Sequence, residues 1–312
     1  MISPLELGLP ARYPQPGLPQ RVRVYEVGVR DGLQAEKEVV STDDKATFIE
    51  MLRATGLSPI EATSFVSPTW VPQLADAEEL LSRLGADLSG YPVLVPNARG
   101  LARAISAGAS TIAVFVSATE TFANRNLNTT RRGALDTATE LATEAVTAGL
   151  KVRGYVSMCF GDPWEGAVPL SAVVDATREL LDAGCYEVSL GDTIGVATPG
   201  HVRALLAALT AAGVPSESIA LHFHDTYGQA LANVHAGLQA GVTCFDASAG
   251  GIGGCPFAGS ATGNLATEDL LWMLAGLGIE TGVDLPAVVA AGAWMTSVLG
   301  KPAQSRVGAA LG

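Results

Sequence analysis

The sequence of 312 residues has little of several features that define whole classes of protein. Charged residues make up only 16% and the net charge is −12, which argues against a surface for nucleic acid or an anionic membrane. No apolar run approaches the roughly 18 residues of a membrane helix. The four cysteines show no CxxC spacing, which predicts a reducing, cytoplasmic location. Residues 1–20 lack the pattern of a signal peptide, and we expect an extended arm there.

What the sequence does have is a regular alternation of apolar, strand-like runs with helical patterns, in units of roughly 30–40 residues. The strands are predicted at 22–27, 59–65, 91–95, 111–116, 151–158, 186–190, 219–224 and 243–248. Eight such units without a long linker predict one α/β domain over 21–312, a (β/α)8 TIM barrel with a C-terminal helical extension from about residue 280. A doubly wound open sheet is the alternative, but no GxGxxG follows the first strand.

Polar residues gather where the predicted strands end, which is where TIM barrels carry their active sites. His222 and His224 point to the same face of the seventh strand because strand side chains alternate. An isolated pair of this kind is more often a pair of core histidines, but Asp31 and Asn264 follow two other strands. These two imidazoles, one carboxylate and one amide oxygen suit Mg²⁺ or Mn²⁺ better than a closed zinc site. Fe²⁺ competes, because two histidines with one carboxylate also bind iron in oxygenases.

Four further residues are candidates for chemistry or its support. Arg30 either forms an ion pair at the strand end or stabilises an oxyanion beside the metal. Cys255 lies in a glycine-rich loop suited to closing over a ligand, and is a candidate proton carrier. Glu61 and Asp192 also lie on strands, and we favour a supporting role in which they orient the other groups.

Seven ordered segments carry a resemblance to a known family. They lie at 28–34, 61–68, 153–157, 189–195, 222–230, 253–256 and 263–269. Together the sequence resembles the 3-hydroxy-3-methylglutaryl-CoA lyases, which belong to a superfamily of metal-dependent TIM-barrel lyases and aldolases. The resemblance runs from about residue 21 to beyond residue 299.

The resemblance implies cleavage of 3-hydroxy-3-methylglutaryl-CoA to acetyl-CoA and acetoacetate, a step of leucine degradation, by a homodimer. It implies that the divalent cation is held by Asp31, His222, His224 and Asn264. Arg30 would then stabilise the thioester enolate, and Cys255 would transfer a proton, with His222 sharing acid–base work. It further implies a set of pocket residues, with a lysine reaching the CoA phosphates: Gln34, Lys37, Glu61 and Tyr155.

Departures from the family pattern leave the acyl group open. Residues 158–164 read Met-Cys-Phe-Gly-Asp-Pro-Trp, where the family more often has Cys-x-x-Gly-Cys-Pro-Tyr. A lyase for a longer-branched 3-hydroxyglutaryl-CoA is therefore the alternative, followed by a Claisen-condensing synthase of the same superfamily. A barrel that binds acyl-CoA or metal without turnover is a third. The C-terminal tail has no cysteine, so we expect no redox control through it.

Overall fold

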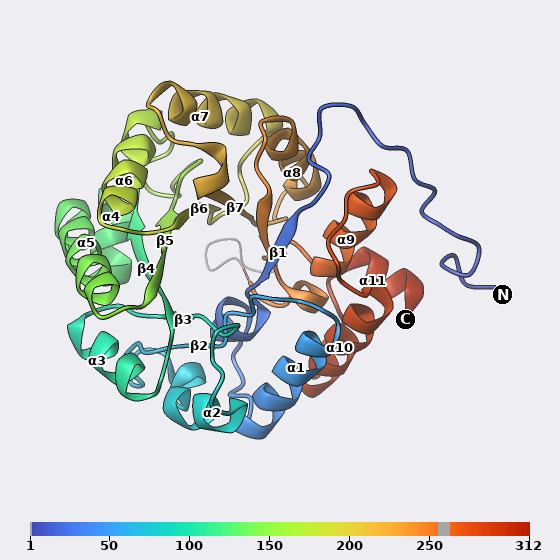
Figure 1. Cartoon of the computed structure of the whole chain (residues 1–312), viewed down its shortest axis with the longest axis horizontal. Helices are drawn as coiled ribbons and strands as arrows, with labels where there is room; N and C mark the ends of the chain where they lie inside the picture. The colour runs from blue at the N-terminus through green and yellow to red at the C-terminus, as the bar shows by residue number, and fades with distance from the viewer. Residues whose placement is uncertain (1, 255–262) are drawn as a thin grey trace.

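The computed structural model describes residues 2–254 and 263–312. Its eight strands are parallel and run in the order β1-β8-β7-β6-β5-β4-β3-β2 (Figure 1). Their bounds are β1 (Arg23–Glu26), β2 (Thr63–Ser64), β3 (Val93–Leu94), β4 (Thr111–Ser117), β5 (Lys151–Ser157), β6 (Glu187–Asp192), β7 (Ile219–Phe223) and β8 (Cys244–Ala247).

A single bridge between Glu26 and Ile60 closes the ring from β1 to the segment before β2. The Glu26 N–H donates to the Pro59 carbonyl at 3.1 Å, and the Glu61 N–H donates to the Glu26 carbonyl at 2.8 Å. The predicted TIM barrel is therefore confirmed. β2 and β3 are much shorter than predicted, because the chain on both sides of each pairs through isolated hydrogen bonds rather than a continuous ladder.

Helices surround the strands on the outside, and α9, α10 and α11 gather on one side near the C-terminus (Figure 1). The α-helices are α1 (Thr42–Ala54), α2 (Ala77–Leu84), α3 (Ala98–Ser106), α4 (Glu120–Leu127), α5 (Arg131–Thr147), α6 (Leu170–Asp182), α7 (Pro199–Ala211), α8 (Ala230–Gln239), α9 (Thr267–Gly276), α10 (Leu285–Val298) and α11 (Arg306–Leu311). Shorter helical turns are η1 (Gly28–Gly32), η2 (Pro72–Leu74), η3 (Ser216–Ser218) and η4 (Ala249–Gly251). Within the described ranges, none of the helices is both long and apolar enough to cross a membrane.

The sequence pattern also predicts a polar loop over 117–128, a helix over 227–240 and a last helix ending near residue 299, and the structure differs at all three. The segment 117–128, expected to be a polar loop, contains α4, which buries Phe122 and Ala123 against the barrel. The helix expected from Tyr227 begins only at Ala230, because Gly228 has a positive φ of 69° and the Asp225 carboxylate accepts the Ala230 N–H at 2.9 Å. The short α11 was not predicted at all.

The arm and the barrel interior frame the site. Residues 2–20 form no helix or strand and run along the outside, where the Tyr13 N–H donates to the Gly276 carbonyl at 2.8 Å. Apolar side chains fill the layer between strands and helices, and Leu221 of β7 faces Gly237 of α8. Inside the barrel, charged residues such as Arg153 and Asp246 are almost completely buried. Buried charged residues of the interior can therefore support side chains at the carboxyl ends of the strands.

Candidate functional site

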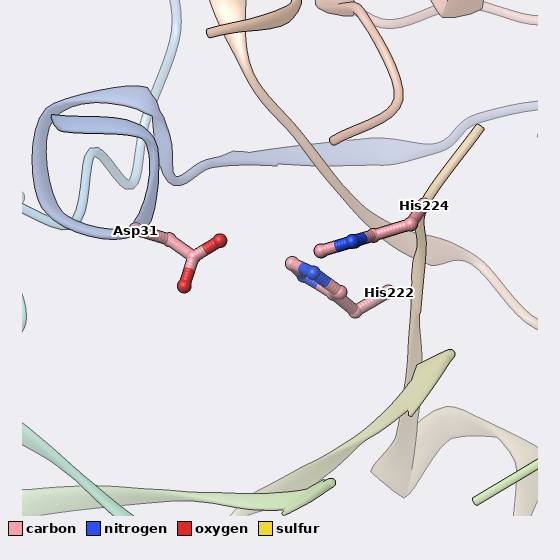
Figure 2. Close-up of side chains that lie close together, drawn as sticks. All are labelled: Asp31, His222 and His224. Atoms are coloured by element: carbon pink, nitrogen blue, oxygen red, sulfur yellow. The ribbon is translucent and has the colours of Figure 1, made fainter. Parts of the chain in front are cut away.

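The site is a cluster of one carboxylate and two imidazoles at the carboxyl ends of β1 and β7. Asp31, His222 and His224 each present one potential ligand atom, and these atoms lie within 4.8 Å of one another. Figure 2 shows the Asp31 carboxylate facing both imidazole rings. Residues 191 positions apart in the sequence are thus brought together by the closed barrel.

The two histidines are placed by ordinary strand geometry. Leu221 and Phe223 of β7 belong to the outer apolar core, and the alternation of side chains turns His222 and His224 inward. Their ring centroids are 5.2 Å apart. A regular strand therefore supplies two nitrogen ligands from residues two positions apart.

Asp31 is placed by a much less regular element. The π-helical turn η1 follows β1, and the N–H groups of Asp31 and Gly32 both donate to the Val27 carbonyl, at 2.8 and 3.2 Å. Isolated π-helical turns are often found at functional sites. The turn begins at Gly28, where a side chain would not fit, because a Cβ there would lie 2.7 Å from the Glu26 carboxylate. That carboxylate instead accepts the N–H groups of Gly28 and Ala249, each at 2.9 Å.

Asn264 completes a donor set that fits a cation. Its Nδ2 donates to Asp31 Oδ2 at 2.9 Å and to the Ile252 carbonyl at 3.2 Å. Gly253 leaves room for it, since a Cβ there would lie 2.6 Å from Asn264 Nδ2. Asn264 Oδ1 and His224 Nδ1 are buried, and neither has a hydrogen-bond partner among the described residues. Buried polar atoms are nearly always paired, so these acceptors fit a bound cation.

The charges of the cluster also suit a cation. Burial disfavours the Asp31 carboxylate, but Arg30 and both histidines outweigh it and lower its pKa to about 2. Burial and the neighbouring His222 lower the pKa of His224 to about 3, so that ring is neutral near pH 7. Burial also opposes protonation of His222, but the hydrogen bond to Asp246 and the charge of Asp31 raise its pKa overall. Carboxylates and neutral imidazoles are the forms that bind metals.

Arg30 lies beside the cluster, fixed by two carboxylates. Its Nε and Nη2 donate to Glu61 Oε2 at 3.0 and 2.8 Å, and its Nη1 donates to Asp31 Oδ1 at 2.8 Å. The Tyr155 hydroxyl also donates to Glu61 Oε2, at 3.0 Å, and the Arg30 guanidinium lies 5.6 Å from the Tyr155 ring centre. These contacts use three of the five guanidinium N–H groups. The other two have no acceptor in the described part of the chain and can donate to a ligand.

The remaining predicted residues are distributed differently. Gln34 is half-buried, and its Oε1 is buried without a hydrogen-bond partner among the described residues, whereas Lys37 is exposed. The Asp192 carboxylate accepts the N–H groups of Val196 and Ala197 at 2.9 and 3.1 Å, which shapes the loop after β6. Burial raises the pKa of Asp192 to about 7. Cys255 lies outside the described residues.

Sequence reasoning missed the buried residues that support the cluster from below. Asp246 of β8 contacts both His222 and Arg153, and Glu26 holds the start of η1. The available signal was a charged residue in the middle of an apolar strand run, since such a residue is almost never buried unless paired.

Known proteins of one family resemble this chain in sequence. The family model HMGL-like matches residues 21–294. A mitochondrial hydroxymethylglutaryl-CoA lyase of Arabidopsis thaliana is 49% identical over 95% of this chain, which spans 63% of that protein's length. A cytoplasmic 3-hydroxy-3-methylglutaryl-CoA lyase of Danio rerio is 49% identical over 94% of this chain and 87% of its own length.

Solved structures point the same way. The hydroxymethylglutaryl-CoA lyase of Pseudomonas aeruginosa superposes with a TM-score of 0.91 at 47% identity, covering 95% of this chain and 98% of that one. An HMG-CoA lyase of Acinetobacter baumannii in complex with coenzyme A and 3-methylmalate has a TM-score of 0.86 at 36% identity, covering 92% and 94%. The chain described here belongs to the HMGL-like family, among the hydroxymethylglutaryl-CoA lyases.

Proposed function

We propose that this protein cleaves 3-hydroxy-3-methylglutaryl-CoA to acetyl-CoA and acetoacetate by a retro-Claisen reaction that depends on a divalent cation. The observation that carries the proposal is the convergence of Asp31, His222 and His224 beside an arginine with unused donors. The family membership supports the same reaction.

Four residues would hold the cation: Asp31, His222, His224 and Asn264. The mixed nitrogen and oxygen donors favour Mg²⁺ or Mn²⁺. When bound, a divalent cation makes the tertiary hydroxyl of the substrate more acidic and so prepares it for loss of its proton.

Arg30 stabilises the charge that develops when the C2–C3 bond breaks. The electron pair of that bond passes to the thioester, where the enolate oxygen becomes negative. Two N–H groups of Arg30 have no acceptor among the described residues and would donate to it, and the guanidinium is already oriented by Glu61 and Asp31. Donors that are fixed before the reaction lower the barrier because they need not reorganise.

Two proton transfers accompany the bond cleavage. The substrate hydroxyl loses one proton, and the enolate carbon gains one to give acetyl-CoA. We assign Cys255 to this proton transfer and His222 to a share of the acid–base work, on the resemblance of the sequence to the family. Glu61 Oε1 is buried without a partner among the described residues, and is an acceptor available to a substrate group.

Substrate recognition is proposed on the same basis. Gln34 and Tyr155 would line the pocket, and the exposed Lys37 would contact the CoA phosphates. The Acinetobacter baumannii relative, which was solved with coenzyme A, supports an acyl-CoA substrate. A related, longer-branched 3-hydroxyglutaryl-CoA is the second candidate, because residues 158–164 depart from the family pattern. There the Asp162 carboxylate accepts the N–H groups of Trp164 and Glu165, at 2.7 and 2.9 Å.

The decisive experiment measures acetoacetate and acetyl-CoA release by chelator-treated protein, with and without added Mg²⁺ or Mn²⁺. We expect no turnover without a cation and full recovery with either one. Failure of every divalent ion to restore cleavage would refute the proposed substrate, and the longer-branched analogues would then be assayed. Recovery with Fe²⁺ alone would refute the proposed cofactor.

We propose that the protein is a cytoplasmic homodimer. A cytoplasmic location agrees with Cys159, Cys185 and Cys244, which are free cysteines among the described residues. Analytical ultracentrifugation tests the dimer, which rests on the family resemblance. A sedimentation coefficient of a monomer at micromolar concentration would refute it.

A further inference from the structure

We propose that Asp246, held by Arg153, is a positioning residue that fixes the orientation and tautomer of His222. The inference rests on the proposed metal-dependent function and adds a residue beneath the ligands. Asp246 Oδ2 lies 3.3 Å from His222 Nδ1. Both residues belong to adjacent, paired strands, and His222 of β7 is in register with Asp246 of β8.

The Asp246 carboxylate is fully committed to neighbours that fix its direction. Arg153 Nη2 donates to Oδ1 at 2.6 Å, and Nη1 donates to Oδ2 at 3.2 Å. The Ser189 hydroxyl also donates to Oδ2, at 2.8 Å. Asp246 is 1% exposed, so its charge depends on these donors rather than on water.

Arg153 is itself immobilised. Its residue exposure is 0%, its Nε donates to Glu187 Oε1 at 2.8 Å, and its guanidinium lies 3.8 Å from the centre of the Tyr25 ring and 4.8 Å from that of Tyr155. An arginine held by two carboxylates and two aromatic rings cannot turn. It therefore transmits a fixed geometry to the Asp246 carboxylate.

An ionised carboxylate only accepts hydrogen bonds, so the nitrogen of His222 that faces it carries the proton. Nε2 of a neutral His222 is then left with its lone pair for the metal. A carboxylate behind a ligating histidine orients the ring and raises its basicity. His224 differs, since its Nδ1 has no hydrogen-bond partner among the described residues.

The tautomer gives a readout that a merely structural role would not change. Nitrogen-15 NMR of metal-free protein, at a pH where His222 is neutral, should show the Nδ1–H form. In Asp246→Asn the amide oxygen is drawn to Arg153 and the NH₂ group turns to the histidine. We expect the Nε2–H form in that variant, with the His224 signals unchanged. Persistence of the Nδ1–H form in folded Asp246→Asn would overturn the proposal.

Metal affinity is the second readout, taken by Mn²⁺ titration of substrate-free protein. We expect Asp246→Asn to bind Mn²⁺ about 10- to 100-fold more weakly, the usual effect of removing such a support. Glu187→Gln is the matched control, because it alters the other side of the same arginine, and its affinity should stay within about threefold of the wild type. An equal loss in both variants would show a general disturbance and overturn the proposal.

Folding is controlled with a double variant. Asp246→Asn leaves the Arg153 guanidinium partly unpaired, whereas Arg153→Met with Asp246→Asn removes both charges. We expect the double variant to remain weak in Mn²⁺ binding, and wild-type affinity in it would overturn the proposal. If neither folds, Ser189→Ala decides, with an expected loss of about two- to tenfold from one hydrogen bond to the same oxygen. Wild-type protein that binds no Mn²⁺ would refute the proposed function instead, while the tautomer still tests this inference.

Discussion

The two sides of the cluster are built in opposite ways. On one side, His222 lies on β7 and His224 directly follows its end, so simple alternation places both, and the strand forms a continuous ladder with β6. At the end of β1, Arg30 and Asp31 are neighbours in a π-helical turn and yet both reach the cluster. Adjacent residues on a strand would face opposite ways. The β1 side therefore depends on an irregular backbone that other residues must hold.

The backbone of the π-helical turn is held in place by a buried carboxylate, that of Glu26. Glu26 accepts the N–H groups of Gly28 and Ala249 and, through its second oxygen, the Thr267 hydroxyl at 2.7 Å. It thus joins η1, η4 and α9 at one point. We therefore expect β1-side variants to disturb both chemistry and stability, whereas replacing His224 on the β7 side should chiefly weaken metal binding.

The largest expected effect comes from Arg30→Gln. It removes the guanidinium that we propose stabilises the enolate, and we expect kcat to fall by about 1000-fold, the upper range for loss of one oxyanion donor. Steady-state assays at saturating Mg²⁺ measure this. Arg103→Gln, which breaks the exposed pair with Glu78, is the control and should leave kcat unchanged. A loss of less than tenfold in Arg30→Gln would contradict the assigned role.

The next effect is on stability, in Glu26→Ala. Two backbone N–H groups and one hydroxyl lose their buried acceptor, so we expect the free energy of unfolding to fall by about 3 kcal/mol. Denaturant unfolding monitored by circular dichroism measures it. Glu38→Ala, at an exposed position, should change it by less than about 0.5 kcal/mol. Similar values for both variants would remove Glu26 as the support of the β1 side.

On the β7 side, His224→Gln should weaken Mn²⁺ binding by at least about 100-fold, since a ligand contributes no less than its outer contacts. Isothermal titration of substrate-free protein gives the dissociation constant. His235→Gln is matched in residue type but lies on α8, where the ring contacts Gln15. Unchanged Mn²⁺ affinity in His224→Gln would exclude it as a ligand.

The smallest expected effect is a change in pH dependence on replacing Glu268. Burial raises its pKa to about 8 from 4.5, so the folded protein keeps a proton that the unfolded chain releases. The free energy of unfolding therefore falls as pH rises from about 4.5 to 8, by about 2 kcal/mol between pH 6 and 8 for this group. Glutamine at position 268 cannot ionise. We therefore expect the free energy of unfolding of Glu268→Gln to fall by about 2 kcal/mol less than that of the wild type between pH 6 and 8. Denaturant unfolding at several pH values measures this, and the same pH dependence in the wild type and in Glu268→Gln would contradict the prediction.

The sequence predicted the parts of the molecule that follow local rules. Alternation along β7 was sufficient to place two imidazoles on one face, and the eight repeated units were sufficient to predict the barrel. It could not predict that Arg153 reaches Asp246, 93 positions away, or that Glu26 reaches Thr267, 241 positions away. Such contacts depend on which strands become neighbours after closure. The π-helical turn was also invisible, because its pattern resembles an ordinary loop after a strand.

Closure of the ring through one bridge links scaffold and ligand in a further way. Beside the two backbone hydrogen bonds of Glu26, the contact of Arg30 with Glu61 ties the β1 turn to the segment before β2. The guanidinium that would contact the substrate therefore also connects the two segments that close the barrel through a single bridge. A ligand that draws Arg30 away from Glu61 would remove this contact between the two segments, and a ligand that leaves the ion pair intact would preserve it. Substrate binding and closure of the barrel would then depend on the same side chain, Arg30.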